Sequence, residues 1–116
     1  MIPERIQVFV YHNDPWWIIH ALAPEFVTLA ERLEGVPAEI QRWLSVLCAA
    51  SYEHGIEPFH GYKPAPQKYW RSFEEAEPWI EPFPSLELPK EFGFGPAPVI
   101  EARLLRYPPP SRFAPE

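Results

Sequence analysis

The sequence is poor in cysteine and glycine. A single cysteine, Cys48, in 116 residues excludes a disulfide within the chain. The chain has only five glycines but 17 prolines, and this excess of proline makes the backbone stiff rather than flexible. No basic and then apolar leader is visible at the amino terminus, and the unpaired thiol favours a reducing, cytoplasmic location.

Long apolar runs and a basic excess are also missing. The most apolar stretch, residues 15–30, is interrupted by proline, histidine and glutamate well before the ~20 residues that cross a bilayer, so we predict no membrane contact. The net charge is −6, from 16 acidic and 10 basic residues. Because this charge repels a phosphate backbone, direct nucleic-acid binding is not expected.

Established catalytic motifs are absent from the sequence. It has no Gly-rich phosphate loop, no G-x-S-x-G and no C-x-x-C. His54, Glu57 and His60 are three residues apart, but Gly55 and Pro58 interrupt the helix that would place them on one face. His54 is better explained by its favourable position at a helix carboxyl terminus.

His12 and Asp14 form the other chemical candidate, since they follow a predicted strand. Asp14 is already explained as a capping or turn residue, and the pair supplies only two of the three protein ligands of a catalytic zinc. We therefore predict no catalytic residue, metal site or cofactor. A small metal-dependent or acid/base enzyme that uses His12, Asp14 and His60 remains the alternative function.

The length favours a single domain, residues 1–116. Residues 5–11, RIQVFVY, are β-branched and aromatic, which predicts a strand; both of its faces are apolar, so we expect it to be covered on both sides. Asp14 and Pro15 are typical of a helix start and predict a short helix over 15–22.

Further prolines divide the rest of the first part, residues 1–55, into two more helices. Pro24 predicts a helix over 24–34 that ends before Gly35. Pro37 begins the most regular helical pattern, which ends at Gly55 and carries Cys48 as a buried, unreactive residue. The two helices are expected to form a hairpin.

The last part of the chain, residues 99–116, begins with a strand pattern over 99–107, in which apolar and charged residues alternate. We expect this strand to pair antiparallel with residues 5–11; the final PPPSRFAPE is restricted to polyproline II or coil. The predicted fold class is α+β: a small helical hairpin core, a two-stranded antiparallel pairing and a long proline/aromatic-rich extended arm.

The arm, residues 56–98, holds nine of the 17 prolines and nine of the 18 aromatic residues. Within it, residues 67–77 have the spacing of a short helix. Glu-Pro-aromatic occurs three times, and each proline presents the following ring from a stiff backbone, as an interface requires. The predicted interface residues are Trp70, Phe73, Trp79, Phe83 and Phe92. Whether these rings pack on their own core or on a neighbouring chain stays open at this point.

These features favour a non-enzymatic structural or interaction subunit of a larger assembly, such as a virion or tail particle. Its partners would be other protein subunits, in a homo- or hetero-oligomer. On this hypothesis, removal of residues 56–98 abolishes complex formation while the helical hairpin still folds. A further alternative is an acidic inhibitor of a host enzyme, whose complex would be steeply sensitive to salt.

Overall fold

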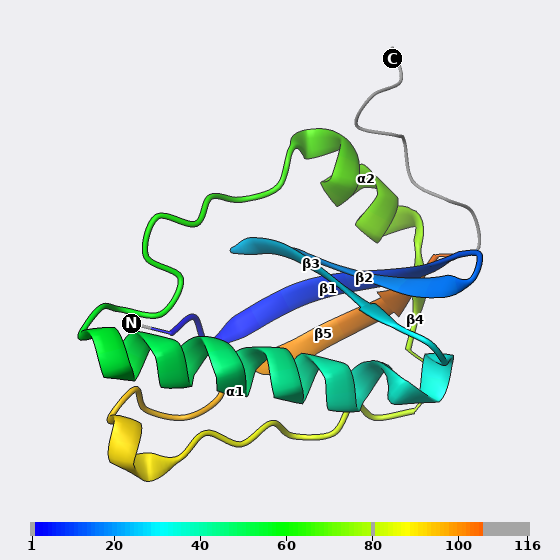
Figure 1. Cartoon of the computed structure of the whole chain (residues 1–116). Coiled ribbons are helices and arrows are strands. Elements are labelled where there is room, and N and C mark those ends of the chain that lie inside the picture. The colour runs from blue at the N-terminus through cyan, green and yellow to red at the C-terminus, as the bar shows by residue number, and fades with distance from the viewer. Residues whose placement is uncertain (1, 80, 106–116) are drawn as a thin grey trace.

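The computed structural model describes residues 2–79 and 81–105 and consists of a five-stranded mixed sheet between two helices (Figure 1). The strand order is β3-β2-β1-β5-β4. The elements, in chain order, are β1 (Arg5–Asn13), β2 (Trp16–Leu22), β3 (Glu25–Ala30), the 3₁₀ helix η1 (Leu33–Gly35), α1 (Val36–His54), α2 (Gln67–Glu75), β4 (Glu77–Pro78), η2 (Lys90–Phe92) and β5 (Val99–Leu104).

The first three strands form an antiparallel meander joined by two-residue turns. Asp14 and Pro15 connect β1 to β2, Ala23 and Pro24 connect β2 to β3, and both prolines follow cis peptide bonds. The prediction of a strand over 5–11 is confirmed. Asp14 is a turn residue, so the predicted role as a helix cap is wrong.

The predicted helices over 15–22 and 24–34 are also wrong, because those residues form β2 and β3. No helical hairpin exists in the described part of the chain. In β2, successive apolar residues such as Ile18 and Ile19 face opposite sides of the sheet and are both buried. A strand that is apolar on both faces does not show the alternation of apolar and polar residues by which strands are recognised. The prolines on either side of β2, Pro15 and Pro24, were therefore interpreted as helix starts.

The helix predicted after Pro37 is confirmed as α1, which ends at Gly55 in the left-handed conformation (φ 67°). Val36 and Ile40 of this helix pack on one face of the sheet, in a cluster with Ile6, Val8 and Val10 of β1. Cys48 lies on this helix and is fully buried, as predicted.

The pairing of residues 5–11 with residues 99–104 is confirmed, but it is parallel and not antiparallel. Residues 81–98 run back beneath α1, so that β5 begins beside the first residue of β1 (Figure 1). That long return determines the direction of β5. Residues 106–107 of the predicted strand, and the tail 108–116, lie outside the described residues.

The other face of β1 is covered by α2, which confirms the short helix predicted within 67–77 (Figure 1). Tyr69 and Phe73 of α2 pack against Phe9 of β1 and Leu22 of β2. Both faces of the central strand are therefore covered, as its apolar pattern predicts. Within residues 2–79 and 81–105, no helix is long and apolar enough to cross a membrane.

Candidate interaction surface

The five predicted interface residues all lie against their own chain. Phe73 is only 5% exposed and Trp70 is half-buried beside it. Trp79 and Phe83 are half-buried against the core between α1 and the sheet, with ring centroids 5.8 Å apart. Phe92 of η2 packs near the buried Leu44 and Cys48. A large part of each ring's surface is thus already used to complete the core.

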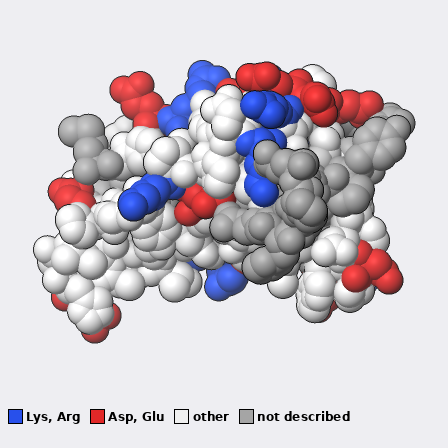
Figure 2. Space-filling model, turned by 90° about the horizontal axis from the view of Figure 1, so that it is seen from above, with Lys and Arg blue, Asp and Glu red and all other residues white. Residues whose placement is uncertain are grey.

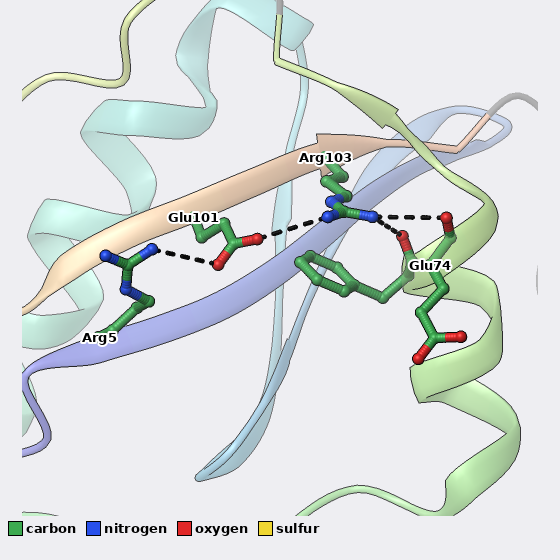
Figure 3. A network of polar contacts seen from close by, with 5 residues as sticks. Arg5, Glu74, Glu101 and Arg103 are labelled. Carbon is green, nitrogen blue, oxygen red and sulfur yellow. Dashed lines mark hydrogen bonds and ion pairs between the residues drawn. The ribbon is translucent and has the colours of Figure 1, made fainter.

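Arg103 of β5 fastens α2 to the sheet (Figure 3). Its guanidinium lies 4.3 Å from the centroid of the Phe73 ring and donates to the carbonyl oxygens of Phe73 (3.0 Å) and Glu74 (3.4 Å). Glu101 bridges Arg103 and Arg5 at 3.5 and 3.4 Å. Because a cation at a helix carboxyl terminus is favourable, this network is explained as a structural contact.

Gln41 holds the arm on the outside of α1. Its side-chain amide donates to the carbonyl of Glu87 and accepts from the Glu87 backbone N–H, both at 2.8 Å. The same Nε2 also donates to Ser45 Oγ at 2.8 Å. The arm is therefore fixed by polar contacts as well as by its rings.

The residues of the alternative enzymatic function are not brought together. His12 and Asp14 are exposed at the β1–β2 turn, whereas His60 lies in the loop after α1, at the opposite end of the sheet (Figure 1). His12 packs beside the Trp17 ring at 4.8 Å. Among the described residues, no group of three or more His, Cys, Asp or Glu side chains could hold a metal ion.

His20 is a buried residue that the sequence analysis left without a role. It is 2% exposed beneath α2, between the rings of Phe9 (5.0 Å) and Tyr69 (4.6 Å). Its Nε2 lies 2.8 Å from Glu25 Oε2. This contact provides a hydrogen-bond partner for Nε2 of a histidine within an aromatic cluster and joins β2 to β3.

The pKa values of Glu39 and Cys48, both on α1, are shifted by their surroundings. The hydrogen bond from the Arg42 guanidinium holds the pKa of Glu39 below its usual range, with a further bond from the Thr28 hydroxyl, although partial burial opposes both. Burial raises the pKa of the Cys48 thiol. A buried thiol with a raised pKa is a poor nucleophile, so Cys48 is a packing residue.

The open part of the sheet lies on the α2 side of β2 and β3. Trp16, Val27 and Leu29 are 38%, 49% and 43% exposed there. Leu29 lies opposite the buried Ile18, and Trp16 is two residues along β2 from Ile18. We call these four residues the apolar strip.

The apolar strip borders a free sheet edge, since β3 is an outer strand. The backbone N–H of Glu25 points away from β2, to the carbonyl of Lys63 at 2.9 Å. Because backbone groups alternate along a strand, Val27 and Leu29 also direct their N–H and C=O groups outward. In the described residues, no strand pairs with this edge.

Figure 2 looks down on the sheet face that carries α2. The charged side chains gather mainly in the upper half of this view, whereas the lower half is largely uncharged. This face therefore has both charged and uncharged regions.

The helix predicted over 24–34 concealed the apolar strip, because a helical period does not place Val27 and Leu29 on one face. The alternation in residues 25–30, with Phe26, Thr28 and Ala30 on one side and Val27 and Leu29 on the other, was the pattern that could have found it.

A scan of protein-family models, a search of curated proteins and a search of solved structures each found no match to this chain.

Proposed function

We propose that this chain is a non-enzymatic interaction subunit of a larger protein assembly, which binds a partner protein at the outer edge of β3. The observation that carries the proposal is the apolar strip beside unpaired backbone groups. An extended segment of the partner adds to the sheet there, as in other cases of β-strand addition. Its apolar side chains cover Val27 and Leu29.

The free edge of β3 lacks the features that usually prevent an edge strand from pairing with another chain. Edge strands commonly carry lysine, proline or a bulge that prevents pairing, and the sequence of β3, EFVTLA, has no lysine or proline. Exposed apolar side chains on such an edge need a cover, and the arm is already committed to α1.

The partner is a different protein and not a second copy. Two copies that each carry a net charge of −6 repel one another. Glu31, Arg32 and Glu34 are exposed directly after β3, and two of these three charges are acidic, so a partner with basic residues fits this edge better. The cytoplasm is our proposed location, since a chain whose only cysteine is the buried Cys48 has no intramolecular disulfide to support it.

The test compares two lysine pairs in the tagged, full-length chain, purified from its source cells. Val27→Lys with Leu29→Lys should reduce recovery of the co-purified partner by about tenfold or more, because lysines on an edge block strand addition. Val46→Lys with Ile56→Lys adds the same charge to exposed positions on α1 and just after it, and should leave recovery unchanged.

Equal recovery with both pairs would contradict the proposal. Light scattering on the purified chain provides the second measurement, with a monomer as the expected result. A dimer that the Val27→Lys and Leu29→Lys variant dissociates would show that a second copy occupies the edge, which also contradicts a different partner.

A further inference from the structure

A separate hollow of about 290 Å³ lies where η1, α1 and the ends of β4 and β5 meet. It is lined by Leu33 and Glu34 of η1, Pro37 of α1, Trp79 and Glu81 beside β4, and Leu104 of β5. Its volume is at the lower end of the range for ligand sites. It therefore fits one side chain or a similarly small group.

The walls of this hollow are apolar, and the two charged residues that line it, Glu34 and Glu81, are both acidic. Leu33, Pro37 and Leu104 provide aliphatic surface, and Trp79 provides an indole. Glu34 and Glu81 are both exposed, and within the described part of the chain neither makes a hydrogen bond or an ion pair. No described lysine or arginine lines the hollow.

We propose that this hollow binds an arginine side chain of the partner protein. The aliphatic stem of arginine packs against apolar walls, and its guanidinium pairs with carboxylates and stacks on aromatic rings. Lysine fits less well, because its compact ammonium is more strongly hydrated and offers no planar group. The acidic side chains of the hollow therefore favour the positively charged guanidinium of arginine as the occupant.

Glu34 connects this site to the edge of β3, and the inference rests on the proposed function in this respect. A second, shallower hollow shares Glu34 and is lined by Trp16 and Leu29 of the apolar strip. A partner segment on β3 therefore continues within reach of the arginine site. Trp79, a predicted interface residue, contributes to recognition from the arm.

The experiment uses the full chain and N-acetyl-arginine amide as the probe, titrated at millimolar concentration and followed by the NMR amide signals of Leu33, Glu34 and Glu81. We expect these signals to shift in a saturable way. The neutral N-acetyl-citrulline amide, which has nearly the same shape, should shift them little. Glu34→Gln with Glu81→Gln should weaken arginine binding by about tenfold.

The matched control is Glu53→Gln with Glu91→Gln, which removes the same charge from exposed positions outside the hollow. It should bind the probe as the unmodified chain does. Equal binding of arginine and citrulline derivatives, or equal binding by the two glutamine variants, would overturn the site.

Free L-arginine separates a protein partner from a small metabolite. Free L-arginine carries a charged ammonium and a charged carboxylate in place of the two amides of the blocked derivative, and these strongly hydrated groups lose water beside the apolar walls, so we expect it to bind more weakly; tighter binding would assign the hollow to a free amino acid and overturn the proposal. Since the probe reports on the hollow alone and the lysine pairs report on the edge, the two proposals can fail separately.

Discussion

The ionised Glu39 side chain of α1 stabilises the contact between α1 and β3. Its carboxylate accepts from the Thr28 hydroxyl at 2.5 Å and is 16% exposed. Glu39→Gln should reduce the free energy of unfolding at pH 7 by about 1 kcal/mol, since the charged acceptor is lost. Urea unfolding measures this difference.

The pH dependence has a definite sign, because the pKa of Glu39 is lower in the folded chain than its ordinary value of 4.5. Its stabilisation is complete well above pH 4.5 and is lost as the pH falls through the lower folded pKa. The difference in the free energy of unfolding between Glu39→Gln and the unmodified chain should therefore become smaller in acid. A difference that stayed constant in acid would contradict this role of the Glu39 carboxylate.

At the residue scale, the sequence predicted which residues are buried better than it predicted which residues lie next to one another. Cys48 is buried and Gly55 ends α1, because both follow from one regular helical pattern. Glu34 and Glu81 gave no indication that they line one hollow, since 46 residues separate them in the chain and only the folded arm brings them together.

At the scale of elements, the contact between Gln41 and Glu87 determines how firmly the arm lies on α1. Gln41→Ala removes both hydrogen bonds and should cost about 1 kcal/mol in the free energy of unfolding. Hydrogen exchange at the Glu87 amide should become faster, because its acceptor is gone.

Ser45→Ala is the control for this exchange measurement. It removes the Ser45 hydroxyl, which also accepts from Gln41, and leaves both bonds to Glu87 in place. Exchange at Glu87 should then stay as in the unmodified chain. Unchanged exchange in Gln41→Ala would show that the arm is held by its rings alone, whereas faster exchange in Ser45→Ala would show that the Ser45 hydroxyl is also needed to position Gln41.

The elements that the sequence predicted correctly are those with a clear period. Helix α1 has five buried residues at helical spacing, and β5 alternates. β2 and β3 were missed because proline opens a helix and fills a tight turn equally well. The direction of β5 depends on the path of residues 81–98, which no local pattern contains.

At the scale of the whole molecule, the arm is part of the core. Phe83, Leu86 and Leu88 are half-buried against it, as are Phe92 and Phe94. Replacement of residues 81–97 by a Gly/Ser linker of equal length should abolish cooperative thermal unfolding. Each half-covered side chain contributes roughly 1 kcal/mol, and together they approach the 5–15 kcal/mol that holds a typical domain.

Near-UV circular dichroism during heating measures this loss of cooperativity. A linker that keeps those five apolar residues at their positions should still melt cooperatively, at a lower temperature. Cooperative unfolding without them would contradict a structural role for the arm. This expectation replaces the earlier one, in which a helical hairpin folds without residues 56–98.

The parallel pairing of β1 with β5 also affects how the chain is made. During synthesis, β2 can pair with β1 early, but the other edge of β1 has no strand until residues 99–104 have been added. At about 5–20 residues per second, the arm alone takes a few seconds to synthesise. For that time the nascent chain exposes an apolar, unpaired strand, so its yield in cells should depend on chaperones that cover such edges.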